Sequence, residues 1–267
     1  MRKVSDELPV GIFDSGVGGL TVMKEIIELL PGENIIYFGD TARVPYGTRS
    51  SGTVTRYSMQ NTEFLMSKGI KALVVACNTA SSVSLPSLRD GFPVPVIGVV
   101  EPGARAAAAD AKSKKIAVIG TEATINSRSY EEAIKAIDGS VEVSGIACPL
   151  FVPLIEEGWL DGDIVKLTAE KYLSSLRYNG LDSIVLGCTH YPMIKDVIKN
   201  VTGVPLIDSA VETAKEVKRV LERKGMLRQS AEEGSREFFV TDFPEKFSRV
   251  GEKFLDHEIT NITKIDL

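Results

Sequence analysis

The chain has 267 residues, 43% of them hydrophobic, which is enough for one large α/β domain or two smaller ones with packed cores. Acidic residues outnumber basic ones by 36 to 31 and no stretch concentrates lysine or arginine, which argues against a nucleic-acid partner. Residues 1–10 contain several charges and no apolar block, and longer apolar runs elsewhere are interrupted. We therefore expect a cytoplasmic protein that does not enter the membrane and whose partners are small solutes.

Apolar runs of strand length alternate with helix-like stretches along nearly the whole chain. The first helix-like stretch places Leu20, Met23 and Ile27 on one face. Alternation of this kind predicts βαβ units, an α/β fold and mostly parallel, doubly wound sheets. The expected strands are 10–13, 35–38, 72–76, 94–99, 116–119, 141–146, 183–186 and 204–207.

Capping residues indicate where several of the helices begin and end. We expect Asn78 to cap one helix and Pro192 to occupy the first turn of another. Gly225 should end the helix that precedes it. A further strand at 238–240 and a short helix from Pro244 are expected to return to the first half of the molecule.

Two cysteines lie in similar local sequences, at 73–79 and at 184–190. In each, an apolar run is followed by a small residue, a cysteine and small polar residues, so Cys77 and Cys188 should lie where a buried strand leaves its sheet. Ligands of open parallel sheets bind at the carboxyl ends of the strands. Two such thiols could approach one small molecule from opposite sides, which suits the movement of a proton through a stereocentre.

The repeat extends upstream of the cysteines, because Asp14 and Gly120 hold similar positions after earlier strands, at similar distances from Cys77 and Cys188. This indicates two halves of related topology. We therefore predict one α/β domain formed by residues 1–98 plus 209–267, which carries Asp14 and Cys77. The second domain, residues 99–208, is inserted into it and carries Cys188 and His190.

The chain has three cysteines and no CxxC pair, so the thiols are expected to be free and reduced. Cys148 fits a buried hydrophobic role without catalytic function. A zinc site built from Cys77, Cys188 and His190 is disfavoured because no metal-ligand spacing supports it. We expect no metal.

The glycine-rich segment 14–19 is a second candidate. Between a strand and a helix, such a segment can cradle an anion, although a tight turn of purely structural purpose explains the glycines equally well. Its spacing matches neither a P-loop nor a dinucleotide fingerprint. Asp14, at the strand end, could accept or orient a proton beside a neighbouring thiol.

His190 could act as an acid or base next to Cys188, or could merely cap the helix that follows. Glu156 and Glu157 are compatible with ordinary acids on a helix surface. A cysteine hydrolase could use Cys188 with His190, but that mechanism leaves Cys77 unexplained. A two-base mechanism explains both thiols.

At these residues the chain resembles the glutamate racemases, cofactor-independent enzymes of the aspartate/glutamate racemase family. The resemblance covers most of the length and is carried by the segments 11–21, 37–40, 45–47, 76–80, 148–150 and 186–192. It implies two similar doubly wound α/β domains with the active site in the cleft between them. It also implies an isomerase without a cofactor that interconverts L- and D-glutamate and supplies D-glutamate for peptidoglycan.

The resemblance also implies roles for individual residues. Cys77 and Cys188 are the proton-transfer pair, with Asp14 assisting Cys77, His190 assisting Cys188 and Glu156 as an acid of secondary importance. Substrate contacts fall on Asp14, Ser15, Tyr46, Gly47, Asn78, Thr79, Thr121, Thr124, Thr189 and His190. The rival interpretations are a cysteine racemase for aspartate or another small acid, and a protein that binds an acidic amino acid without turnover. A homodimer is left open.

Overall fold

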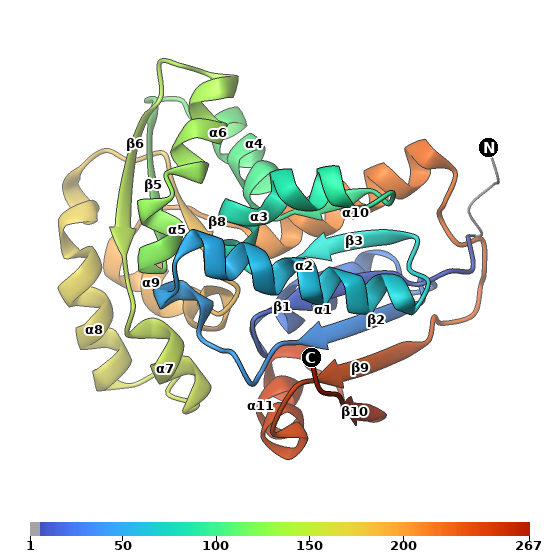
Figure 1. Ribbon diagram of the computed structural model, residues 1–267. Helices are drawn as coiled ribbons and strands as arrows, with labels where there is room; N and C mark the ends of the chain where they lie inside the picture. Colours follow the sequence, from blue (N-terminus) through green and yellow to red (C-terminus); the bar gives the residue numbers. More distant parts are fainter. Residues whose placement is uncertain (1–5) are drawn as a thin grey trace.

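The protein is built on two parallel β-sheets (Figure 1). The computed structural model describes residues 6–267, except the side chains of Asp110 and Tyr178. The six-stranded sheet has the order β10-β9-β2-β1-β3-β4 and consists of β1 (Val10–Asp14), β2 (Ile35–Gly39), β3 (Ala72–Val75), β4 (Val96–Gly98), β9 (Arg236–Val240) and β10 (Ile262–Lys264). The four-stranded sheet has the order β6-β5-β7-β8 and consists of β5 (Lys115–Gly120), β6 (Glu142–Ala147), β7 (Ser183–Gly187) and β8 (Leu206–Asp208).

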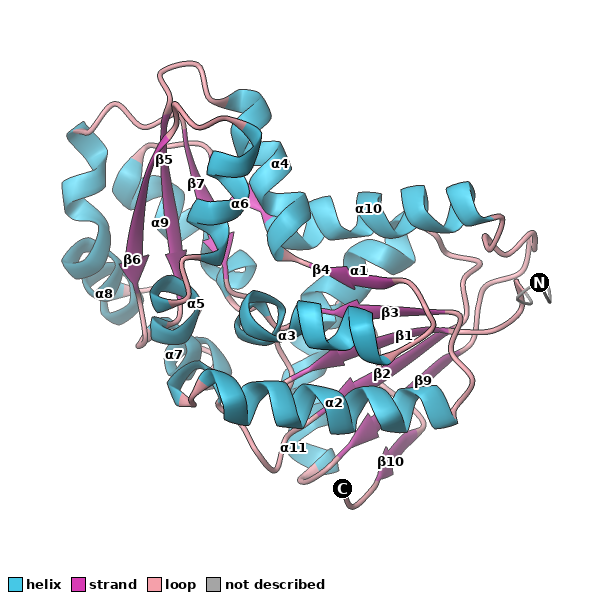
Figure 2. Ribbon diagram, turned by 45° about the horizontal axis from the view of Figure 1, so that its top comes forward, coloured by secondary structure: helices cyan, strands magenta, loops and turns pink. Residues whose placement is uncertain are grey.

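Helices cover both faces of each sheet (Figure 2). One face of the larger sheet packs against α1 (Leu20–Leu29), α10 (Ser209–Lys224) and α11 (Pro244–Leu255), and the other against α2 (Ser51–Ser67) and α3 (Asn78–Gly91). The smaller sheet lies between α4 (Val100–Asp110) with α6 (Ser129–Ile137) on one face and α7 (Phe151–Glu156), α8 (Asp163–Leu173) and α9 (Lys195–Thr202) on the other. The short helices are α5 (Glu122–Asn126), η1 (Tyr46–Thr48), η2 (Ser174–Tyr178) and η3 (Tyr191–Ile194).

The central strands are apolar on both faces. All five residues of β1 are buried; Ile12 packs into the cluster that contains α1, and its neighbour Phe13 packs into the cluster that contains α2. Successive side chains of a strand point to opposite faces, so a strand covered on both sides needs a continuous apolar run. This is why the central strands of this chain are nearly continuous apolar segments. The predicted doubly wound α/β fold is confirmed.

Each expected strand coincides with an observed one, and the helix end at Gly225 is confirmed, with a left-handed φ of 63°. Pro192 stands in the first turn of η3, as expected. The expected cap of α3 is wrong by one residue: Asn78 is the first helical residue, and Cys77 is the N-cap because its sulfur accepts the hydrogen bond from the amide of Ala80. Strand β10 was not predicted at all.

In each sheet, the carboxyl ends of two neighbouring strands lie at the same level. In the larger sheet Phe13 of β1 pairs with Val75 of β3, and in the smaller sheet Gly120 of β5 pairs with Gly187 of β7. Parallel pairing therefore brings the residues that follow these strands together at one edge of each sheet. This places the segments after β1 and β3 beside each other, and likewise those after β5 and β7.

The chain passes between the sheets twice, between β4 and α4 and between β8 and α10. Strands β5 to β8 all lie between these passages in the sequence, and α10 packs beside α4. The domain limits at residues 98 and 208 stay a prediction. Within residues 6–267, no helix is both long and apolar enough to cross a membrane.

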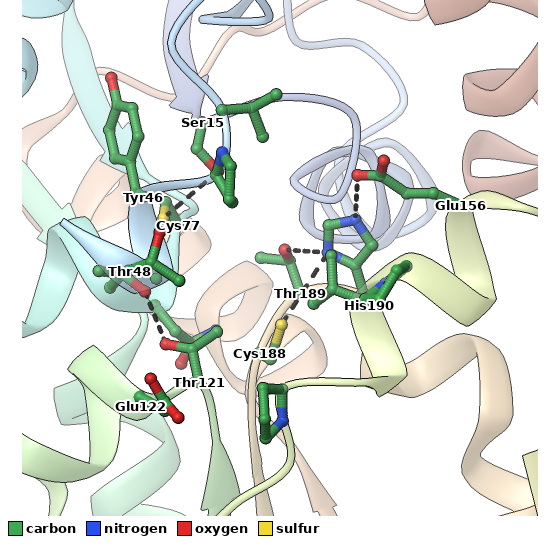
Figure 3. A pocket seen from close by; sticks show the side chains of 18 residues that line it. Ser15, Tyr46, Thr48, Cys77, Thr121, Glu122, Glu156, Cys188, Thr189 and His190 are labelled. Atoms are coloured by element: carbon green, nitrogen blue, oxygen red, sulfur yellow. Dashed lines mark hydrogen bonds and ion pairs between the residues drawn. The ribbon is translucent and has the colours of Figure 1, made fainter. Parts of the chain in front are cut away.

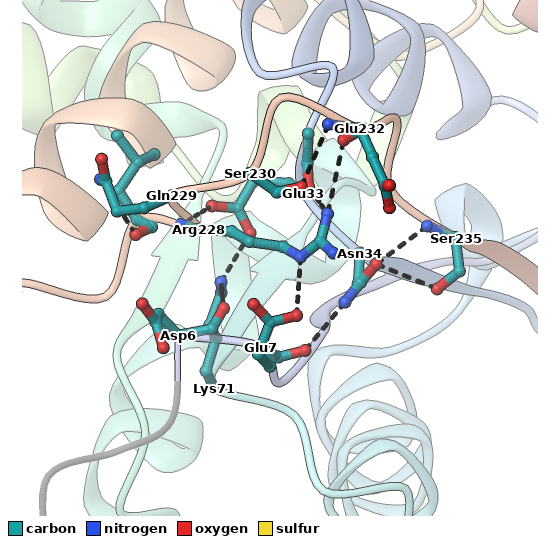
Figure 4. A network of polar contacts seen from close by, with 12 residues as sticks. Asp6, Glu7, Glu33, Asn34, Lys71, Arg228, Gln229, Ser230, Glu232 and Ser235 are labelled. Carbon is teal, nitrogen blue, oxygen red and sulfur yellow. Dashed lines mark hydrogen bonds and ion pairs between the residues drawn. The ribbon is translucent and has the colours of Figure 1, made fainter.

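A buried ion pair lies at the amino-terminal edge of the larger sheet (Figure 4). Lys71, directly before β3, places its Nζ 2.6 Å from Oε2 of Glu33, and both side chains are almost fully buried. The backbone amide of Arg228 donates to the other oxygen of Glu33 at 2.8 Å, and its guanidinium donates to the carbonyl of Gly32 at 2.9 Å. The network fixes the segment after α10 against the sheet, at the end of β3 opposite Cys77.

Candidate active site

A cavity of about 330 Å³ lies where the carboxyl ends of both sheets face each other (Figure 3). This volume is within the range of small-molecule sites. It is lined by Ser15, Val44, Pro45, Tyr46, Gly47, Thr48, Cys77, Asn78, Thr79, Thr121, Glu122, Pro149, Val152, Pro153, Glu156, Cys188, Thr189 and His190. Of the predicted site residues, all belong to this lining except Asp14 and Thr124.

Cys77 enters the cavity from the larger sheet, at the N-terminus of α3. Its sulfur accepts a hydrogen bond from the amide of Ala80 at 3.5 Å and lies 3.8 Å from the hydroxyl oxygen of Ser15. Burial, together with the nearby carboxylate of Asp14, raises the pKa of the thiol to about 12, although the amide of Ala80 and the hydroxyl of Ser15 oppose this rise. Cys77 is therefore protonated at neutral pH.

Asp14, at the end of β1, lies next to this thiol. Its Oδ2 accepts a hydrogen bond from the amide of Gly16 at 2.9 Å, whereas the buried Oδ1 has no hydrogen-bond partner within residues 6–267. Burial raises the pKa of the carboxyl above its usual value, against the lowering effect of His190. A buried carboxyl with one unused oxygen is suited to handling a proton or an ammonium group.

The glycine-rich segment after β1 packs directly against the second half of the molecule. A Cβ at Gly18 would lie 2.4 Å from the ring of His190 and from the hydroxyl oxygen of Thr189, and a Cβ at Gly19 would lie 2.6 Å from the Cβ of Asp14. These contacts require glycine for close approach, which favours the structural explanation of the turn. The hydroxyl of Thr21 adds a hydrogen bond to the carbonyl of Thr189 at 2.9 Å.

Cys188 enters the cavity from the smaller sheet and is accompanied by a histidine and an acid. The sulfur of Cys188 lies 3.9 Å from Nδ1 of His190, and Nε2 of His190 lies 3.2 Å from Oε1 of Glu156 (Figure 3). Burial acts to lower the pKa of His190, but the hydrogen bonds to Cys188 and Glu156 outweigh it and raise the pKa to about 10. The imidazole is therefore a cation at neutral pH.

The structure argues against a purely capping role for His190, whereas its role as an acid or base stays a prediction. The residue is the N-cap of η3, but its side chain makes no capping hydrogen bond. Burial acts to raise the pKa of Glu156, but the hydrogen bond from His190 and the charges of His190 and Lys246 outweigh it and lower the pKa. Glu156 is thus an anion that faces the imidazolium, and not an unpaired acid on a helix surface.

Three threonines form a hydroxyl cluster between the two halves. The hydroxyl oxygen of Thr79, in the first turn of α3, lies 2.9 Å from that of Thr121 and 3.3 Å from that of Thr124. Thr121 is also the N-cap of α5 and accepts a hydrogen bond from the amide of Thr124 at 3.3 Å. Thr121 therefore belongs to the cavity lining, and Thr124 adjoins the lining through its hydroxyl contacts to Thr79 and Thr121.

Tyr46 contributes differently from the other lining residues, because its hydroxyl is directed away from the cavity. It donates to Oδ2 of Asp40, and the side-chain amide of Asn61 donates to its oxygen at 3.1 Å. Burial and the adjacent Asp40 carboxylate raise the pKa of this phenol. Asp40 also pairs with the guanidinium of Arg43 at 2.7 Å, so this network fixes the segment that carries Gly47.

Sequence reasoning missed part of the cavity wall, in particular the apolar side chains of Val44 and Val152 and the hydroxyl of Thr48. The only available signal was their position next to the motifs at 45–47 and 148–150. Cys148 is fully buried, and burial raises its pKa to about 12, in agreement with the expected hydrophobic role. Among the described residues, no group of three or more His, Cys, Asp or Glu side chains is arranged to hold a metal ion.

Comparisons with known proteins agree with this geometry. Residues 10–217 match the model of the Asp/Glu/Hydantoin racemase family. The glutamate racemase of Geobacter metallireducens is 55% identical over 260 residues, which cover 97% of this chain and 96% of that protein.

Two solved structures are also similar, each covering 98% of both chains. A glutamate racemase isoform of Bacillus anthracis is 41% identical with a TM-score of 0.94, and the glutamate racemase of Francisella tularensis, solved in complex with D-glutamate, is 39% identical with a TM-score of 0.92. The chain therefore belongs to the glutamate racemases of the Asp/Glu/Hydantoin racemase family and is an isomerase.

Proposed function

We propose that the protein interconverts L- and D-glutamate by proton transfer between Cys77 and Cys188. The observation that carries this proposal is the position of the two thiols, which follow corresponding strands of two sheets and line one cavity. One base removes the α-proton from one face of the substrate, and the other thiol returns a proton to the opposite face.

The two cysteines have different charged neighbours. Burial and Asp14 keep Cys77 as a thiol, because its pKa is about 12. Beside Cys188, the imidazolium of His190 has its Nδ1 3.9 Å from the sulfur. In the direction from L-glutamate, we propose that Cys188 takes the proton as the Cα–H bond breaks, and the proton of the Cys77 thiol forms the new Cα–H bond of D-glutamate.

The carbanion-like state needs hydrogen-bond donors around the α-carboxylate of the substrate. The N-terminus of α3 supplies backbone amides and a favourable dipole beside Cys77. The side-chain nitrogen of Asn78 is buried and has no partner within the described part of the chain, and Thr189 adds a hydroxyl. These groups, together with Ser15 and Thr79, are our candidates for binding the substrate.

Glutamate is the substrate we favour because the Francisella tularensis relative was solved with D-glutamate, and 98% of each chain is covered in the comparison. The product D-glutamate would serve peptidoglycan synthesis in the cytoplasm. Aspartate remains the alternative substrate, and the same cavity could bind an acidic amino acid without turnover. A homodimer stays a prediction.

A single experiment separates these functions. The purified protein is incubated with L-glutamate, D-glutamate or either enantiomer of aspartate, with and without a metal chelator, and the products are resolved by chiral chromatography. Interconversion of the glutamate enantiomers, unaffected by the chelator, is expected. Interconversion of the aspartate enantiomers alone would show that aspartate, and not glutamate, is the substrate. Binding of glutamate without interconversion would show that the protein binds an acidic amino acid without turnover.

A further inference from the structure

Tyr130 contacts both cysteine segments, residues 73–79 and 184–190, although it is distant from both in sequence. It lies on α6, next to the smaller sheet, and only 2% of its surface is exposed. Its hydroxyl donates a hydrogen bond of 2.6 Å to Oδ1 of Asn78, the residue after Cys77. Burial raises the pKa of the phenol, so the hydroxyl keeps its proton and remains a donor.

The ring of Tyr130 packs close to two glycines. A Cβ at Gly103 would lie 3.3 Å from one edge of the ring, and a Cβ at Gly187 would lie 3.3 Å from the other. Gly187 directly precedes Cys188. The tyrosine therefore packs beside one cysteine segment and donates its hydrogen bond to the other.

The hydrogen bond determines which way the Asn78 amide faces. Asn78 lines the cavity and is 3% exposed, and its Nδ2 is buried without a partner among residues 6–267. The two orientations of an asparagine amide are distinguished only by its hydrogen-bond partners. A donor on the Oδ1 side leaves the NH₂ group free for an acceptor, which a substrate carboxylate provides.

We propose that Tyr130 is a positioning residue for the racemase reaction, which orients the Asn78 amide so that its NH₂ group faces the substrate carboxylate. This inference rests on the proposed function. Without the hydroxyl, Oδ1 of Asn78 would lose its buried donor, and the amide could turn to present its oxygen to the carboxylate. In that orientation, the amide oxygen would repel the substrate carboxylate at the position where the NH₂ group attracts it.

The test is a double-mutant cycle of Tyr130→Phe with Asn78→Ala, read as kcat and KM for each glutamate enantiomer. Tyr130→Phe keeps the ring and should lower kcat/KM about tenfold, the effect of one hydrogen bond to a charged group. In the Asn78→Ala background, the same change should have no further effect, because no amide remains to be oriented. Equal fold losses in both backgrounds, or no loss in either, would overturn the proposal.

Tyr191→Phe is the matched control. Tyr191 is fully buried and its hydroxyl donates to the carbonyl of Cys148 at 2.9 Å, outside the cavity lining. This variant should lose a similar amount of stability and keep kcat/KM within about twofold, which separates the orienting effect from the loss of a buried hydrogen bond.

The same cycle is also measured as the Kd for D-glutamate by calorimetry, in a Cys77→Ser, Cys188→Ser background that does not turn over. Non-additive Kd values support the role of Tyr130, and additive ones refute it. Failure of the wild-type protein to racemise glutamate would contradict the proposed function alone, because the binding cycle still decides whether Tyr130 orients Asn78.

Discussion

Nε2 of His190 lies 3.2 Å from Oε1 of Glu156, and this contact holds the ring so that its Nδ1 faces the sulfur of Cys188. The histidine is buried, yet its pKa is raised to about 10 because the two partners outweigh burial. The ring would otherwise be neutral in so apolar a position. Glu156 therefore acts through His190 on the charge next to Cys188.

Replacing the Glu156 carboxylate should change the pH dependence of racemisation. Glu156→Gln removes a charge that raises the pKa of His190, so the imidazolium should lose its proton at lower pH than in the wild type. The imidazolium is lost as pH rises through the pKa of His190, and in the variant this pKa is lower. We therefore expect the alkaline limb of racemisation from L-glutamate to move to lower pH. Activity at pH 8 should fall about tenfold.

Glu157→Gln is the matched control, because Glu157 is the exposed neighbour and does not line the cavity. The measurement is kcat/KM from pH 6 to 10 for the three proteins. An unchanged alkaline limb in Glu156→Gln would show that the carboxylate does not control the charge of His190.

The two thiols should serve opposite enantiomers. In deuterium oxide, Cys77→Ser should still exchange the α-proton of L-glutamate, because Cys188 is intact, and should not exchange that of D-glutamate. Cys188→Ser should show the mirror pattern, and each variant should lose racemisation by about 10²–10⁴-fold. Proton NMR of each enantiomer measures the exchange.

Cys148→Ala is the control for this pair, since its thiol lies outside the cavity lining. It should racemise at nearly the wild-type rate once the protein is shown to be folded. If each single serine variant treated both enantiomers alike, one base would serve both faces and the two-base mechanism would be wrong.

Asp14 should make the protein less stable at neutral pH. Burial raises the pKa of Asp14 in the folded state above its value in the unfolded state, so the folded state holds the proton more tightly. The free energy of unfolding therefore falls as pH rises from the unfolded pKa through the folded pKa. Asp14→Asn should therefore raise Tm at pH 8 by about 2–4 °C, equivalent to about 1 kcal/mol, while activity falls. Calorimetry at pH 8 and pH 4 tests this, since the gain should shrink at pH 4, and a lower Tm at pH 8 would contradict it.

The buried pair of Lys71 and Glu33 should matter for stability and not for catalysis. Lys71→Met leaves the Glu33 carboxylate buried without its cation and should lower the free energy of unfolding by about 3–5 kcal/mol. Adding Glu33→Leu should recover most of that loss, because no uncompensated charge remains. Urea denaturation measures both. A double variant as unstable as Lys71→Met would show that the loss comes from packing and not from the buried charge.

The sequence was most informative where chemistry depends on neighbours along the chain. Cys77 and Cys188 follow apolar strands, so the sequence alone predicts their positions at the strand ends. The orientation of the Tyr46 hydroxyl towards Asp40, and of the Tyr130 hydroxyl towards Asn78, depends on how helices pack and could not be derived. These contacts leave no periodic pattern in the sequence.

Strand β10 and the cap of α3 were missed for more local reasons. Two of the three residues of β10, Ile262–Lys264, are exposed, and it forms only by pairing with β9, so no alternating pattern marks it. At α3 the asparagine suggested the cap, but the preceding cysteine sulfur makes that hydrogen bond. A sulfur atom is a weak acceptor, and residue preferences do not anticipate it.

The absent side chain of Gly18 determines how the two halves meet. The backbone of the first half touches the His190 ring and the Thr189 hydroxyl at a point where even one added carbon would not fit. A side chain at this position could be accommodated only if the His190 ring and the Thr189 hydroxyl moved away. Because both residues line the cavity, the bare backbone of Gly18 lets the first half of the molecule approach the cavity wall directly.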